Sequence, residues 1–452
     1  MDVLRLFSRV YLASVFVCLP LFAAPATPPP DTACSLTPDT DQRMDFRPGY
    51  MPRDYDGSIS EFRDTITRLE DQLGVYDAAL IPELIGLGLA LQAQGQHGSS
   101  VAPFKRALHL SRINDGLYNL GQVPILTRIV AGYDADDDGL QTARTLDYLL
   151  QLERHHYGAE DPHLLPVLCL MIDRHLGASE RELSGKTTLE LIAAYSKLKK
   201  TIRIIDQNFG SNDSRLTELL FSLAVTHFRL ELYRDKISDA LHPSLARKDS
   251  AMYHFINGGE LTTARIMPYN EGRDALARRM ELIRDDPHAS AENKFEAMLA
   301  LGDWYFLFNK RDDALEVYHQ ARSIFADKHV APDVLSQAFD QPKVLSFDRL
   351  GKAIEENDAT EYVDVRFTVS AYGRARNIEI GDANTPYKTV RQALRAIKPV
   401  RFRPRLVEGK PVSTKGVTYR HAVKVKNKGT FQKTARSAVG REGPVAVAFI
   451  ER

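Results

Sequence analysis

Apolar residues recur at helical spacing almost without interruption from residue 58 to residue 326, and no other feature restricts the fold as much. Residues three or four positions apart share one face of an α-helix, so this spacing predicts many consecutive helices. Within the stretch, a Gly-x-x-Asp-x-x-Leu motif begins at Gly74, Gly158 and Gly210. Glycine can end one helix and aspartate can begin the next. The motif therefore predicts a repeated helix–turn–helix unit of about 40 residues.

A second pattern occurs twice: a Leu-Gly pair is followed at matched spacing by an aromatic or large apolar residue, a small residue, an aromatic residue and an alanine. Its members are Leu87, Gly88, Leu91, Ser100, Phe104 and Ala107 in one place and Leu301, Gly302, Tyr305, Ala314, Tyr318 and Ala321 in the other. The small residues let two helices approach, and the aromatic side chain fills the gap to the next unit. The pattern resembles the tetratricopeptide repeat. This resemblance implies a right-handed α-solenoid over residues 58–330, with roughly five to seven helix pairs, which binds peptides or proteins.

The C-terminal part of the chain has a different periodicity. Apolar and polar residues alternate from residue 362 to 370, which predicts a strand with one buried face. Gly373 predicts a turn, and Pro399 ends a later helix. The expected elements are strands at 362–370 and 374–380, a helix at 387–397 and a strand at 416–425. This β-β-α-β order predicts a small sheet with one helix on its face.

Residues 359–426 resemble the C-terminal domain of the TonB family. The resemblance rests on the alternating first strand, the turn Gly373-Arg374-Ala375-Arg376-Asn377-Ile378, the helix ending Ala396-Ile397-Lys398, the segment Val400-Arg401-Phe402-Arg403-Pro404 and the turn Gly409-Lys410-Pro411-Val412. The chain departs from the family in lacking a Tyr-Pro pair before the first strand. The family's domain pairs with a short segment of an outer-membrane receptor, partly by strand addition. The resemblance implies that the last strand is the docking edge, with the partner-binding residues Gly416, Val417, Thr418, Tyr419, Arg420, His421, Ala422 and Val423.

Residues 1–26 have the pattern of a secretory signal peptide. Arg5 and Arg9 precede a short apolar run, and cleavage after Ala23 or after Ala26 fits the small residues that follow. An uncleaved inner-membrane anchor is the alternative. Export predicts a protein outside the cytoplasm, and the resemblance to the TonB family implies the periplasm of a Gram-negative bacterium. Residues 27–57 are expected to form a linker rich in Pro, Thr and Asp.

After cleavage two cysteines remain, Cys34 and Cys169. An oxidising compartment permits a disulfide bond between them. Cys169 also lies in an apolar stretch, where a free thiol packs well. Both interpretations are open.

The formal net charge is zero, which predicts no nucleic-acid partner, but the charge is unevenly distributed. Residues 395–428 contain many Lys and Arg residues, Arg403 among them, and only one acid, Glu408. This basic face predicts either contact with an anionic envelope surface or acidic protein, or a solvated surface. Residues 331–358 are expected to connect the domain closely to the last repeat, and residues 427–452 to form a largely disordered basic tail.

No sequence motif of an enzyme or cofactor site is present, so neither activity nor cofactor is predicted. Residues 134–139 match the beginning of a calcium-binding loop, but the position that requires a glutamate ligand holds Thr145. Asp138 is therefore expected to cap a helix instead. Three histidines lie near acidic residues, but their spacing is not that of metal ligands: His155, His156 and His163. They predict a polar loop between repeats.

The sequence thus predicts a mainly α protein: a TPR-like α-solenoid followed by a small α+β domain. We expect a non-enzymatic periplasmic scaffold whose C-terminal domain docks an envelope partner. The alternative is a TonB-type energy transducer for outer-membrane transport, which requires an uncleaved N-terminal anchor.

Overall fold

A computed structural model describes residues 58–181, 187–232, 268–326, 332–345, 361–383, 390, 391, 394, 397 and 400–423. The predicted signal peptide, the linker at 27–57 and the basic tail at 427–452 lie outside these residues. Within the described part, no helix is both long enough and apolar enough to cross a membrane.

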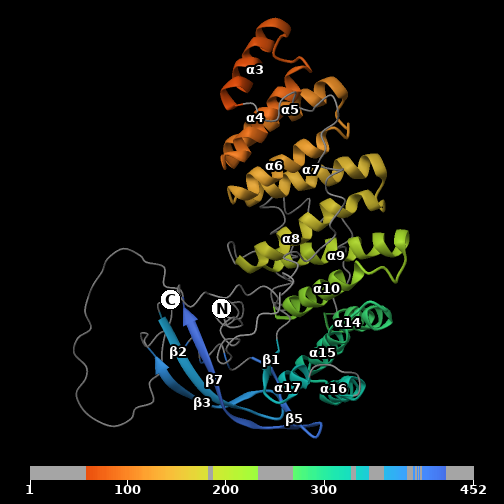
Figure 1. The fold of residues 1–452 in the computed structure, drawn as a ribbon, viewed down its shortest axis with the longest axis vertical. Helices are drawn as coiled ribbons and strands as arrows, with labels where there is room; N and C mark the ends of the chain where they lie inside the picture. The colour runs from red at the N-terminus through yellow and green to blue at the C-terminus, as the bar shows by residue number, and fades with distance from the viewer. Residues whose placement is uncertain are drawn as a thin grey trace, which may run out of the picture.

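Most of the described residues belong to a stack of helices that begins at α3 (Figure 1). The helices are α3 (Ile59–Leu73), α4 (Leu80–Ala93), α5 (His97–Asp115), α6 (Gln122–Ala135), α7 (Gly139–Tyr157), the 3-10 helix η2 (Pro162–Leu164), α8 (Leu165–Arg181), α9 (Thr187–Phe209), α10 (Leu216–Leu232), α14 (Pro268–Asp285), α15 (Ala291–Leu307), α16 (Arg311–Ala326) and α17 (Pro332–Phe339). They pack as the pairs α4–α5, α6–α7, α8–α9, α10–α14 and α15–α16. These helices therefore form a TPR-like α-solenoid, and the five pairs among the described residues agree with the predicted range.

Glycine turns separate the successive pairs, as the repeated motif predicts. Gly74, Gly158 and Gly210 have φ values of 89°, 101° and 94°, a region that side chains with a Cβ rarely adopt. The aspartate that follows stabilises the turn before the next helix: the Asp77 carboxylate accepts the amide of Ala79 at 2.8 Å. The predicted helix cap is wrong for α4, whose N-cap residue is Ala79 and has no side-chain cap. Gly116, midway between Gly74 and Gly158, makes the same turn with φ 96°. The motif misses it because Asn119 replaces the aspartate and Gln122 replaces the leucine.

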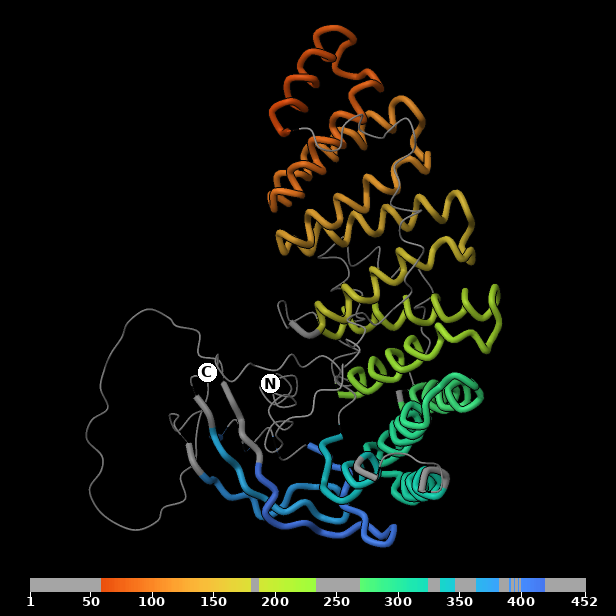
Figure 2. The backbone as a smooth tube through the Cα atoms, viewed as in Figure 1, coloured from red at the N-terminus to blue at the C-terminus, as the bar shows by residue number. Residues whose placement is uncertain are grey.

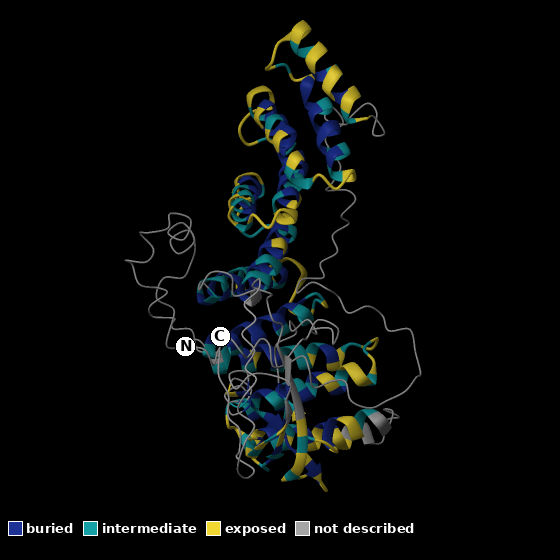
Figure 3. Cartoon of the chain, turned by 90° about the vertical axis from the view of Figure 1, so that its left-hand side faces the viewer, coloured by how far each residue is buried: buried dark blue, intermediate teal, exposed yellow. Residues whose placement is uncertain are grey.

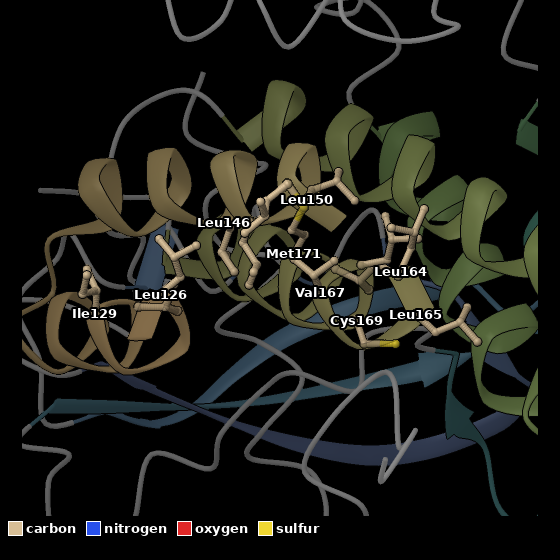
Figure 4. Packing of buried hydrophobic residues seen from close by; sticks show 14 of the residues in the cluster. Leu126, Ile129, Leu146, Leu150, Leu164, Leu165, Val167, Cys169 and Met171 are labelled. Carbon is tan, nitrogen blue, oxygen red and sulfur yellow. The ribbon is translucent and has the colours of Figure 1, made fainter. Parts of the chain in front are cut away.

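Within the pairs, the Leu-Gly pattern has the predicted packing role. A Cβ atom added at Gly88 would lie 2.6 Å from the Phe104 ring, and one at Gly302 would lie 2.5 Å from the Tyr318 ring. Glycine is therefore required where these aromatic rings pack. Buried residues continue through the stack (Figure 3), and Figure 4 shows such packing between α6, α7 and α8.

Three antiparallel strands form the main sheet: β2 (Glu361–Val369), β3 (Ala375–Ala383) and β7 (Thr414–Val423), in the order β3-β2-β7. The predicted alternation along β2 is confirmed. Its apolar side chains and the described residues of the expected helix form one buried cluster: Val363, Val365, Phe367, Val369, Val390 and Ile397.

Two smaller antiparallel pairs join this sheet to the end of the solenoid. β1 (Lys343–Val344) pairs with β4 (Phe402–Arg403), and β5 (Arg405–Val407) pairs with β6 (Lys410–Val412). The sequence predicts an extended segment and a turn here, but not these strand pairs. In Figure 2 the sheets lie at the end of the stack opposite α3, beside the α15–α17 region.

Candidate functional site

The predicted docking residues, 416–423, all lie on β7, at one edge of the main sheet. β7 pairs with β2, and among the described residues no strand pairs with its other side. Val417 lies opposite Phe367 and packs against the sheet core, whereas Gly416 and Thr418 are exposed. The side chains of residues 419–423 lie outside the described part, so their contribution to partner selection stays a prediction.

The other edge of the sheet, β3, is less regular than β7. The β2–β3 register shifts twice, and Asn377 in β3 has a φ of 48°. The β2–β7 register shifts once, near Gly416, which has a φ of 72°, and is then continuous from Phe367 opposite Val417 to Glu361 opposite Val423. Bulges and local twist protect a sheet edge from pairing with another strand. β7 is therefore the edge better suited to accept one.

A buried ion pair joins the sheet region to the last helix pair. Arg403 on β4 donates from Nε to Asp303 Oδ1 at 2.8 Å and from Nη2 to Asp303 Oδ2 at 2.6 Å. The Arg403 side chain is 5% exposed and that of Asp303, on α15, is 17% exposed. A two-point contact between guanidinium and carboxylate fixes orientation as well as distance.

Two further hydrogen bonds satisfy the groups of this ion pair. Arg403 Nη1 donates to the Ala338 carbonyl at 3.0 Å, and the Tyr318 hydroxyl donates to Asp303 at 2.6 Å. Burial opposes the charge on Arg403, but the carboxylate of Asp303 outweighs it and raises the pKa of Arg403. Burial and the same carboxylate raise the pKa of Tyr318 well above its ordinary value. The sequence interpretation of Arg403 as part of an outward basic face is thus wrong: its acidic partner is within the chain.

Apolar contacts surround this ion pair. Leu406 of β5 packs in a cluster with Phe306, Tyr318 and Phe339 of the last helices. Gly373 has a φ of 65°, and a Cβ atom there would lie 2.1 Å from the Phe402 carbonyl oxygen and 2.5 Å from the Phe306 ring. Contacts from β4, β5 and Gly373 therefore hold this part of the sheet region against the last helices.

The loop residues considered for metal binding have structural roles. Asp138 accepts the Gln141 amide and caps α7, as predicted. His155 stacks on Tyr118 across neighbouring turns, with ring centroids 4.0 Å apart. His163 donates its backbone amide to Asp161 at 2.8 Å. Across the described part of the chain, no three His, Cys, Asp or Glu residues gather as metal ligands would.

Cys169 takes part in a disulfide bond. Cys34, its predicted partner, lies outside the described residues, as does Cys18, so the pairing stays a prediction.

Sequence reasoning misses a partly buried polar cluster between α9, α10 and α14. Tyr195 and Lys199 donate to Glu271 at 3.0 and 3.2 Å, and His227 Nε2 lies 3.6 Å from the same carboxylate. His227 is fully buried, and burial lowers its pKa to about 4, against the opposite effect of Glu271. The cluster joins helices that are far apart in the sequence, so no local motif marks it.

No protein-family model and no curated protein matches the sequence. Among solved structures, the chain is similar to BtubC (BKLC) from P. vanneervenii, with 12% identity, a TM-score of 0.32, and coverage of 62% of this chain and 92% of that one. It is also similar to the nearly identical TPR-like repeats of a putative kinesin light chain from Podosopora anserina. There the identity is 14%, the TM-score 0.32, and the coverage 59% and 99%.

Proposed function

We propose that this chain is a non-enzymatic, periplasmic protein-interaction scaffold whose C-terminal sheet docks an envelope protein by strand addition at β7. The observation that carries the proposal is the continuous stretch of β7 from Val417 to Val423, at an edge whose outer side has no strand partner among the described residues. Such an edge offers a row of backbone donors and acceptors to an incoming strand. The resemblance of this region to the TonB C-terminal domain supports the same edge.

The junction with the solenoid gives this edge a defined position. Because Arg403 and Asp303 are held bidentately and Leu406 is buried beside them, the sheet does not swing freely on a linker. A partner docked on β7 would therefore be held at a fixed orientation to the helix stack. This arrangement suits a scaffold, which brings two bound components together at a set geometry.

Proline scanning of β7 tests the docking edge. In an antiparallel ladder, backbone amides alternate between the two sides of a strand, and proline removes the amide hydrogen. We therefore expect Thr418→Pro and Tyr419→Pro to differ. The variant whose lost amide points outward keeps the β2–β7 pairing but loses envelope cross-links, and the other unfolds the sheet.

The controls are two single variants of neighbouring residues on β3, Glu379→Pro and Ile380→Pro. The β3 variant that keeps its fold by circular dichroism should keep its envelope cross-links. Unchanged cross-links in the folded β7 variant would show that β7 is not the docking edge.

The alternative function, energy transduction, depends on the N-terminus. The intact mass and N-terminal sequence of the protein from its native envelope distinguish the two. A start at Ala24 or Thr27 in the soluble periplasmic fraction supports the scaffold. An intact N-terminus in the inner membrane would instead favour a transducer in which the solenoid is a rigid spacer.

A further inference from the structure

Exposed apolar residues gather at two neighbouring turns of the helix stack. One turn connects α3 to α4, and the other connects α5 to α6. Six large apolar side chains at or beside these turns are 49–63% exposed: Leu73, Val75, Tyr76, Ile113, Leu117 and Tyr118. Single exposed apolar residues are common on protein surfaces, whereas a group of them marks a surface that contacts another molecule. These six residues are called the apolar edge below.

Hydrogen bonds between the two turns hold the apolar edge together. Asn114, near the end of α5, donates from Nδ2 to the Tyr76 carbonyl of the preceding turn at 3.1 Å. The same amide group donates to the Leu110 carbonyl of its own helix at 2.9 Å. The Arg106 guanidinium donates to the Val75 carbonyl at 3.4 Å. The two turns therefore have a fixed position relative to each other, and binding would not require ordering of this backbone.

The next turn along the stack continues this surface with basic residues. Tyr118 of the apolar edge stacks on His155, near the end of α7, with ring centroids 4.0 Å apart. The two neighbours of His155 in the sequence, Arg154 and His156, are exposed. Lys200 on α9 lies close enough to Arg154 to sense its charge, because burial and then Arg154 lower the pKa of Lys200. Positive charge therefore adjoins one end of the apolar edge.

The positive charge at this end is not neutralised within the described part of the chain. Arg203 engages Glu160 and donates to its two carboxylate oxygens at 3.1 and 3.2 Å. Among the residues that the structure describes, no carboxylate forms an ion pair with Arg154 or Lys200. Lys197 and Arg203 add further positive charge around Lys200. A carboxylate from another molecule would reduce this repulsion.

The order of these features restricts the partner. Asp71 and Asp115 are exposed beside the apolar edge, so a uniformly anionic surface would meet like charge there. The apolar residues follow successive turns, and the cations lie beyond them. We propose that this surface binds an extended segment of a partner protein, with apolar side chains on the apolar edge and carboxylates against Arg154 and Lys200. The inference goes beyond docking at β7 and does not depend on it.

A library of random peptides displayed on phage tests the proposal with the full-length protein. The library is first depleted on the variant Tyr76→Ser with Tyr118→Ser and then selected on the parent protein. The enriched peptides are expected to combine apolar or aromatic residues with acidic residues at one end, and their affinity should fall as salt is raised. A selection that yields no binder, or binders without acidic residues, would overturn the proposal.

A second variant tests the cations with the same selected peptides. Arg154→Gln with Lys200→Gln should weaken their binding at least about tenfold. Matched controls change exposed residues of the same kinds at other places: Arg144→Gln with Lys310→Gln, and Leu140→Ser with Val407→Ser. Both controls should leave binding unchanged, and circular dichroism checks that every variant is folded. Equal weakening in the controls, or unchanged binding in the Arg154 and Lys200 variant, would contradict the proposed surface.

Two other occupants of the apolar edge would give different results. If a second copy of the chain covers it, sedimentation equilibrium should show a dimer that Tyr76→Ser with Tyr118→Ser dissociates. If a membrane covers it, the protein should co-sediment with vesicles containing phosphatidylglycerol, and the same variant should not. Either result would overturn the proposal, whereas a monomer that binds the selected peptides and not the vesicles supports it.

Discussion

The Arg403–Asp303 ion pair makes a quantitative prediction about the junction between sheet and solenoid. Asp303→Ala leaves the guanidinium of Arg403 buried, with the Ala338 carbonyl as its remaining hydrogen-bond acceptor among the contacts described above. Breaking one side of a buried pair costs about 3–5 kcal/mol, because the other charge stays desolvated. Loss of the Tyr318 hydrogen bond adds about 1 kcal/mol. We therefore expect Asp303→Ala to be among the most destabilising single substitutions near this interface.

Replacing both partners should cost much less than the two single substitutions suggest. Asp303→Leu with Arg403→Met removes both charges and leaves apolar side chains beside Leu406 and Phe339. Buried ion pairs can often be replaced in this way at little cost. A double-mutant cycle built from Asp303→Leu, Arg403→Met and the double variant should therefore give a coupling energy of about 2–3 kcal/mol.

The protein carries its own probe for this experiment. Trp304 is the single tryptophan of the chain, is fully buried and follows Asp303 directly. Urea unfolding followed by its fluorescence reports on α15 and the junction. Arg405→Met, at an exposed position of β5, serves as control and should change stability by less than about 0.5 kcal/mol. A cost below about 1 kcal/mol for Asp303→Ala, or additive costs in the double variant, would refute the reasoning.

Three further predictions concern the helix stack. Gly88→Ala places a Cβ atom against the Phe104 ring and should destabilise by about 1–3 kcal/mol in urea, whereas the control Gly177→Ala, with open space around it, should stabilise by up to about 1 kcal/mol. A cost for Gly177→Ala equal to that of Gly88→Ala would contradict the packing argument. Because burial lowers the pKa of His227 to about 4, the unfolded chain binds more protons than the folded chain between pH 6.5 and 4. The free energy of unfolding should therefore decrease as the pH is lowered through this range, by up to about 1.4 kcal/mol per pH unit. His227→Phe should reduce this dependence on pH. An unchanged dependence would show that other groups control it. Ser58→Ala removes the capping box of α3 and should cost about 1 kcal/mol, measured as faster hydrogen exchange confined to the first turn of α3; exchange that stays as slow as in the parent protein would contradict this role.

The sequence predicts the local parts of this fold well, because local patterns determine them. Positive φ at Gly74, Gly158 and Gly210 and the close approach at Gly88 follow from residue type and spacing alone. The alternation along β2 likewise fixes which side of the strand is buried. Each of these features depends on neighbours within a few turns of the chain.

The junction and the buried His227 cluster are not predictable in this way. Arg403 and Asp303 are 100 positions apart, and charge counting alone assigns Arg403 to a solvated face. His227 meets Glu271 only because α10 packs against α14. Such pairings depend on the tertiary arrangement, so their residues carry no local signal. The position of β7 at the edge follows from strand order, but the irregularity of β3, which makes β7 the better edge, needs the observed register.

Site-specific photo-cross-linking from the two sheet edges in the native envelope tests the docking proposal most directly. A photo-reactive residue at Thr418 on β7 is compared with one at Glu379 on β3, both exposed. The account predicts a discrete protein adduct from position 418 that is absent from position 379. Adducts of equal yield at both edges, or an adduct only at position 379, would contradict docking at β7.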